Sequence, residues 1–115
     1  MAVDNARVVD VVSVSEGAGE VLLDIADHLD WSHERAHLLM LEKKINAYLE
    51  FIESGQLIEA YPDACGKVPV IHIACYHPPT TAARAFFDDV RRIVEMEGVK
   101  LTYKHSHFNS PPQAI

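Results

Sequence analysis

The sequence contains no long apolar run, few cysteines and no excess of basic residues. A helix needs roughly 20 consecutive apolar residues to span a bilayer, and no segment approaches that length. The segment Met1 to Arg7 lacks the basic and then apolar order of a secretory signal. Cys65 and Cys75 are spaced neither as a redox C-x-x-C pair nor as a zinc-finger pair, so we expect reduced thiols. These absences predict a cytoplasmic protein with no membrane partner.

Basic side chains are too few to favour a nucleic-acid partner. The formal net charge is −7, whereas duplex binding draws much of its affinity from cations that neutralise phosphates. A glycine-rich phosphate loop is also missing, because Gly17 and Gly19 connect two predicted strands and do not precede a helix. What is present is 49% hydrophobic and 23% charged sequence over 115 residues. That composition and length predict one globular domain at residues 1–105, followed by a flexible tail at 106–115.

The segment 25–55 organises the predicted fold. Apolar residues at three- and four-residue steps predict a helix from Ser32 to Ser54, capped by Asp30 or Ser32 and ended by Gly55. This stripe is formed by Leu38, Leu41, Ile45, Tyr48, Leu49 and Ile52. A second helix is predicted from Thr80 or Thr81 to Gly98. Valine-rich or alternating segments predict four strands, at Arg7–Val14, Glu20–Asp27, Lys67–Tyr76 and Val99–His105. The connector Gln56–Gly66 is compatible with a helical turn or a short strand.

The element order ββαβαβ, with both helices amphipathic, predicts an α+β two-layer sandwich. In this fold a four-stranded mixed sheet carries both helices on one face, and its first two strands form an antiparallel hairpin. The opposite face is then uncovered, and its third strand is more apolar than a solvated face requires. We therefore expect a homodimer or another protein partner on this face. The candidate contact residues are Trp31, Val70, His72, Ala74 and Tyr76.

The segment His33 to His37 matches H-E-x-x-H, the motif in which two histidines one helical turn apart bind zinc beside a catalytic glutamate. Arg35 places a cation beside this site, and no separate helix supplies an obvious third ligand. His37 also continues the buried row toward Leu41, which favours a hydrogen-bonded core histidine over a ligand. A zinc or nickel site without proteolysis is the alternative, with Asp27 beside the candidate ligands. These candidates are His28, Asp30, His33 and His37.

Three further residues near predicted element ends have open roles. Cys75 and His77 are two residues apart on a strand, which is compatible with a thiolate and its base, but their side of the strand favours a buried inert thiol. Trp31 is predicted either to pack onto the next helical turn or, if exposed, to anchor a ligand or partner.

Several segments resemble an uncharacterised family of small bacterial proteins. The resemblance covers residues 4–105 and is carried by Asp27–Ser32, His37–Tyr48, Phe51–Gly55, Ala60–Ala64 and Tyr76–Pro79. It implies a compact α+β bacterial domain and supplies no activity. His37 belongs to the family pattern and His33 does not, which counts against a mechanism that needs both histidines.

The sequence favours a non-enzymatic protein without a cofactor that acts through protein contacts. Self-association, an accessory role or immunity-type inhibition of a basic toxin would suit its acidic charge and partly apolar open face. The competing hypothesis is a small-molecule or metal-binding protein, including a hydrolase, that uses the histidine-rich entry to the first helix.

Overall fold

The computed structural model describes residues 11–15, by their backbone, and residues 19–105. The strands are β1 (Val11–Ser15), β2 (Glu20–Asp27), β3 (Val68–Cys75) and β4 (Lys100–His105). The helices are α1 (Glu34–Glu53), α2 (Gln56–Ala60) and α3 (Thr81–Glu95), with a 3-10 turn, η1, at Pro62–Ala64. Residues 7–10 of the first predicted strand and the predicted tail at 106–115 lie outside the described residues.

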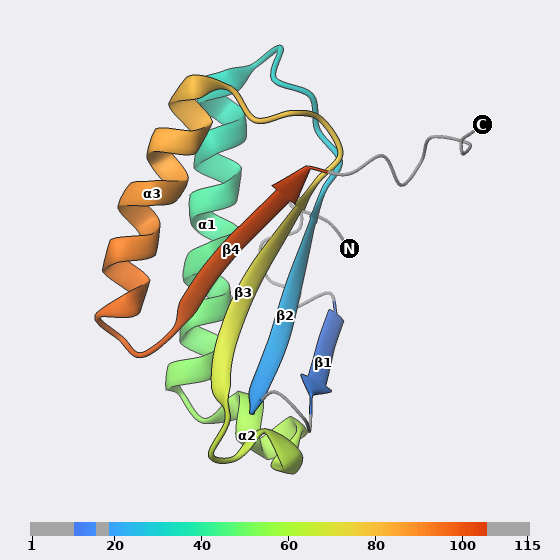
Figure 1. The fold of residues 1–115 in the computed structure, drawn as a ribbon, viewed down its shortest axis with the longest axis vertical. Coiled ribbons are helices and arrows are strands. Elements are labelled where there is room, and N and C mark those ends of the chain that lie inside the picture. Colours follow the sequence, from blue (N-terminus) through green and yellow to red (C-terminus); the bar gives the residue numbers. More distant parts are fainter. Residues whose placement is uncertain (1–10, 16–18, 106–115) are drawn as a thin grey trace, which may run out of the picture.

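The strands follow one another across the sheet in the order β1-β2-β3-β4 (Figure 1). β2, β3 and β4 are parallel, and β1 pairs antiparallel with β2 at the edge. Each parallel neighbour is reached through a helix, by α1 from β2 to β3 and by α3 from β3 to β4. Right-handed crossovers that advance in the same direction place their helices on the same face of a sheet.

The class is α+β, but the predicted architecture needs correction. We expected a four-stranded mixed sheet. The sheet is instead a three-stranded parallel unit, β2-β3-β4, and β1 adds only a short antiparallel pairing at its edge. The described residues contain three α-helices instead of two, in the order ββααβαβ instead of ββαβαβ. The additional helix, α2, is only five residues long, too short to show a helical repeat in the sequence. It forms where the connector buries Leu57 and Ala64.

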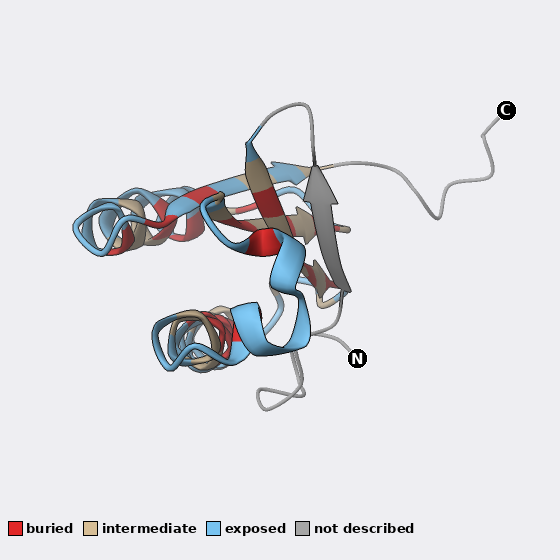
Figure 2. Cartoon of the chain, turned by 90° about the horizontal axis from the view of Figure 1, so that it is seen from below, coloured by how far each residue is buried: buried red, intermediate tan, exposed pale blue. Residues whose placement is uncertain are grey.

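The core lies between the sheet and the two long helices. Alternate residues of β2 and β3 are buried, namely Val21, Leu23, Ile25, Ile71, Ile73 and Cys75. They form one cluster with Leu41, Ile45 and Tyr48 of α1 and with Ala83, Phe87 and Val94 of α3. Both long helices therefore cover the same face of the sheet, and Figure 2 shows buried positions on α1 and α3. The opposite face carries the intervening strand residues.

The two helix starts differ in how they are capped. Thr80 caps α3 as predicted, because its hydroxyl oxygen accepts a hydrogen bond from Ala83 N at 3.1 Å. The predicted cap of α1 by Asp30 or Ser32 was wrong, since His33 occupies the cap position without a side-chain bond to the helix. Asp30 instead accepts hydrogen bonds from the backbone and hydroxyl of Ser32. The Asp30 carboxylate therefore orders the turn before α1 and leaves the first helical amides to other partners.

Candidate functional site

The carboxyl ends of the parallel strands and the starts of both long helices meet at one edge of the sheet (Figure 1). Ligands of open parallel sheets usually bind at this edge. Most of the described histidines lie along it, at a strand end, in the following connection or at the start of α1. They are His28, His33, His37, His77 and His105. This edge is therefore the first place to look for a functional site.

A buried acid and imidazole pair lies at the centre of this edge. Asp27 ends β2, where Tyr76 N donates to its backbone carbonyl at 2.9 Å. His37, on the second turn of α1, places Nε2 at 2.7 Å from both carboxyl oxygens of Asp27. The other ring nitrogen, Nδ1, lies 3.0 Å from the Asp30 carbonyl oxygen. Asp27 is 1% exposed and His37 2%, so the pair is closed off from water.

The geometry requires that the pair hold a proton. The Asp30 carbonyl can only accept, so Nδ1 of His37 carries a hydrogen and donates it. If Asp27 is ionised, it can only accept, so Nε2 carries a hydrogen and donates it. If Asp27 is protonated, its hydroxyl donates to Nε2 instead. In both cases one hydrogen lies between Asp27 and Nε2. Burial raises the pKa of the Asp27 carboxyl, while the charge and hydrogen bond of His37 act in the opposite direction. Both ring nitrogens of His37 are thus engaged within the protein.

Trp31 and Cys75 complete the surroundings of the pair. The Trp31 ring stacks on the His37 ring, with centroids 3.7 Å apart, as the prediction of packing onto the next turn implied. Its indole Nε1 is buried and has no hydrogen-bond partner within the described part of the chain. Cys75 is 1% exposed, and burial together with the charge of Asp27 raises the pKa of its thiol to about 12. The prediction that this thiol is buried is confirmed, and its raised pKa disfavours the reactive thiolate form.

The candidate metal ligands are close in sequence but have different roles. His28 is exposed, and Nδ1 of His33 lies 3.2 Å from the Ser32 hydroxyl. Hydrogen bonds from Ser32 lower the pKa of Asp30, and His37 would have to leave Asp27 and Asp30 to present a lone pair to an ion. In the described ranges, no group of three or more His, Cys, Asp or Glu side chains is placed to hold a metal ion. Zinc or nickel binding stays a prediction, without support from this arrangement of side chains.

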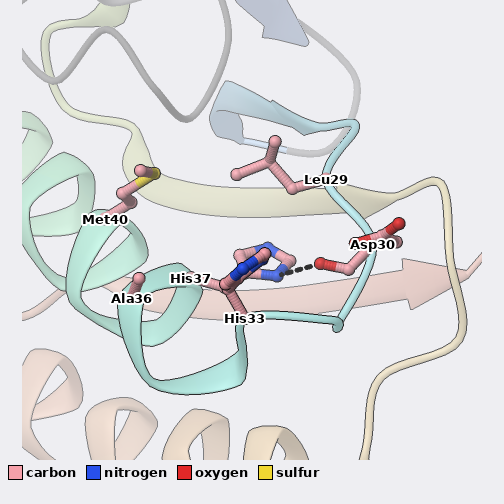
Figure 3. Close-up of a pocket in the computed structure, with 6 residues that line it drawn as sticks. All are labelled: Leu29, Asp30, His33, Ala36, His37 and Met40. Carbon is pink, nitrogen blue, oxygen red and sulfur yellow. Dashed lines mark hydrogen bonds between the residues drawn. The ribbon is translucent and has the colours of Figure 1, made fainter.

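A hollow of about 230 Å³ opens beside the pair, lined by Leu29, Asp30, His33, Ala36, His37 and Met40. Figure 3 shows Met40 and Ala36 on α1 and Leu29 on the preceding connection, around this space. A second hollow, lined by Leu39, adjoins the same helical turn and shares Ala36 and His33 with the first. Leu39 is 52% exposed and Met40 37%. We call Leu29, Ala36, Leu39 and Met40 the α1 strip.

The predicted interaction residues do not form one exposed surface. Trp31 stacks on the buried His37 ring. Val70, His72, Ala74 and Tyr76 lie on the face of β3 opposite the helices, where Val70 is only 3% exposed and the others are half-buried. His72 Nδ1 lies 2.6 Å from the Thr102 hydroxyl. Val68, on the same face of β3, is 39% exposed, so the exposed apolar surface there lies at the start of the strand.

Sequence reasoning missed one contact that joins the two long helices and one close approach of two acids. The Thr80 hydroxyl donates a hydrogen bond to the Glu34 carboxylate and so joins the starts of α1 and α3. At the other end of the helices, Glu97 lies close enough to Glu53 to raise the pKa of the Glu53 carboxyl. No local sequence pattern predicts the contact between Thr80 and Glu34. The second could have been suspected from the acids that gather near both helix ends where cations are usual.

Comparison with other proteins leaves the activity open and assigns the family. Among the described residues, no helix combines the length and the apolar character needed to cross a membrane. The searches of curated proteins and of solved structures found no match. The resemblance to an uncharacterised family is confirmed by a family model: the chain belongs to DUF6572, a family of unknown function whose model matches residues 1–107.

Proposed function

We propose that the protein is a non-enzymatic bacterial domain that acts through protein contacts, and that the α1 strip pairs with a second copy of the chain. The observation that carries the proposal is the exposure of Leu39 and Met40, at 52% and 37%, beside two hollows on the same helix. Neighbouring apolar side chains exposed on one helix face mark an interaction site more often than scattered single residues do. Free thiols at Cys65 and Cys75 support a cytoplasmic setting.

The charges beside the α1 strip suit a two-fold contact between identical helices. Arg35 and Glu42 are exposed on α1 on either side of Leu39. Glu42 is seven positions after Arg35, which is about 10 Å along a helix. When two α1 helices cross in an antiparallel manner near Leu39, Arg35 of each copy approaches Glu42 of the other. A two-fold interface must be self-complementary in this way. The apolar residues would then fill the hollow of the opposite copy.

The chemistry of the sheet edge supports a binding role over catalysis. A general base needs a free nitrogen or oxygen within reach of substrate, whereas both nitrogens of His37 are engaged with Asp27 and Asp30. A nucleophilic cysteine needs a thiolate, whereas burial and the charge of Asp27 raise the pKa of Cys75 to about 12. The pair is therefore better suited to fixing the start of α1, and with it the α1 strip, than to reacting with a substrate.

Sedimentation equilibrium of the full chain across micromolar concentrations tests the proposal. We expect a monomer–dimer equilibrium that Leu39→Glu shifts to monomer, because an apolar contact cannot take up a carboxylate without a large desolvation cost. Ile58→Glu is the matched control, since Ile58 is also exposed, at 38%, but lies on α2 outside the α1 strip. Circular dichroism checks that both variants fold. A monomer at every concentration, or equal dissociation by both variants, would overturn the proposal.

A further inference from the structure

The C-terminal halves of α1 and α3 leave a groove of about 500 Å³ between them. Leu49 of α1 and Ile93 of α3 give it apolar walls, and Ile93 is 60% exposed. Glu50 and Glu53 of α1 and Glu97, just beyond α3, provide carboxylates along its rim. The groove lies at the opposite end of α1 from the α1 strip, so the two surfaces are separate.

The charge of this groove is not compensated by its neighbours in the described residues. α1 has no basic residue in its last turn, and Arg92 in the last turn of α3 is paired with Asp89 at 2.7 Å. Within residues 19–105, Glu50, Glu53 and Glu97 form no ion pair. A hydrogen bond to Glu97 and the charge of that residue raise the pKa of Glu53. The acids repel one another where both helix dipoles also present their negative ends.

A cationic ligand would reduce the repulsion among these acids. The apolar walls of the groove limit which kind of cation fits best. Cations are the stabilising charges at helix C-termini, so three acids there weaken the isolated domain. A hydrated metal ion or a polyamine would gain little from Leu49 and Ile93. Lysine and arginine, by contrast, carry a charge on an apolar stem, and a neighbouring aliphatic side chain could enter between the walls. The combination of walls and rim therefore suits a peptide segment better than a simple cation.

We propose that the groove between the C-terminal ends of α1 and α3 binds a basic amphipathic segment of a partner protein. Lysine or arginine side chains of that segment lie against Glu50, Glu53 and Glu97, and an aliphatic side chain lies between Leu49 and Ile93. The inference rests on the proposed function, that the domain acts through protein contacts, and specifies the chemistry of the partner. Opposite charges would also speed the encounter with such a partner.

Fluorescence anisotropy with a labelled peptide of leucine and lysine alone, about four helical turns long, tests the inference. The matched peptide replaces leucine by serine and keeps the charge. We expect the leucine–lysine peptide to bind the full-length protein and the serine–lysine peptide to bind at least about tenfold more weakly, a difference of ~1.4 kcal/mol. Equal binding of the two peptides would overturn the amphipathic requirement, and displacement by stoichiometric calcium would identify a metal site instead.

Two double variants separate the groove from the overall negative charge. Glu53→Gln with Glu97→Gln should weaken binding of the leucine–lysine peptide about tenfold or more. Asp63→Asn with Asp88→Asn removes the same charge from exposed positions that do not line the groove, and should change binding by less than about twofold. Equal losses in the two double variants would refute the inference.

Two controls make the outcome unambiguous. The glutamine variant should unfold at a higher temperature than the natural chain, because it relieves the repulsion between Glu53 and Glu97, so weaker binding in it cannot be ascribed to misfolding. Leu39→Glu should leave peptide binding unchanged, because Leu39 does not line the groove. Peptide binding is measured by anisotropy and self-association by sedimentation. A negative result for the groove can therefore be told apart from a negative result for the dimer.

Discussion

Replacing His37 by phenylalanine should destabilise the protein by about 3–5 kcal/mol at neutral pH, the usual cost of leaving one member of a buried ion pair without its partner. Phenylalanine keeps a flat ring on which Trp31 can stack, as it does on His37, where the centroids of the two rings are 3.7 Å apart. It removes the donors that face Asp27 and the Asp30 carbonyl. Because Asp27 is 1% exposed, water cannot replace them. The loss is a large share of the ~5–15 kcal/mol that stabilises a typical domain.

The penalty should depend on pH in a defined direction. Burial raises the pKa of Asp27 above its ordinary value of 3.8, so its contribution to stability is fully present below that pH and is lost as the pH rises through the folded-state pKa. Phenylalanine removes the charge and hydrogen bond of His37 that lower this pKa, so the folded-state value rises further. The variant should therefore lose more stability at pH 8 than at pH 5.

Urea unfolding of the variant and of an Asp27→Asn control measures the effect. The asparagine amide can donate to Nε2 while Nδ1 still donates to the Asp30 carbonyl, so this control should cost only about 1 kcal/mol. For a domain of this size, 3–5 kcal/mol lowers the urea midpoint by about 2 M. A loss below about 1 kcal/mol for His37→Phe, or the same loss at both pH values, would refute the assignment of a shared proton to this pair.

One labelling experiment and two substitutions test other features of the fold. Native protein at pH 8 should react with one equivalent of a thiol reagent, at Cys65, and with a second only after unfolding, because the raised pKa keeps the buried Cys75 thiol protonated; two rapid equivalents would contradict this. Thr80→Ala should cost about 1 kcal/mol in thermal or urea unfolding by removing the acceptor for Ala83 N, and Thr80→Ser should restore most of it. Gly55→Ala should lower the melting temperature, at a cost of about 1 kcal/mol, because φ is +89° there; an unchanged value would show that the turn can rearrange.

The long elements could be predicted from the sequence because each has its own period. The stripe of Leu41, Ile45 and Tyr48 specifies α1, and the alternation of Val21, Leu23 and Ile25 specifies β2. The same logic fails for α2, which is shorter than two helical turns and depends on burying Leu57. The start of α1 was also wrongly assigned, because Asp30 binds the adjacent Ser32 in preference to the helix.

The candidate site could be predicted only in part. The period of α1 places His37 among buried residues and so predicts a hydrogen-bonded histidine, which is confirmed. The alternation of β2 puts Asp27 on the core side, a signal that it needs a buried partner, but that partner lies ten residues further on and no pattern identifies it. The groove between α1 and α3 depends on how two distant helix ends meet, which only the tertiary structure shows.

Among the described strands, β4 lies at one edge of the sheet, and this edge bears on how a partner could approach. An uncovered outer strand offers unpaired amides and carbonyls to any extended chain, and lysines on it discourage such pairing. β4 carries the exposed Lys100 and Lys104, and Arg91 Nε of α3 reaches the Leu101 carbonyl oxygen at 3.4 Å. Fibril-like stacking or strand addition along this side would have to displace that guanidinium and bury two ammonium groups. Strand addition along β4 is therefore disfavoured.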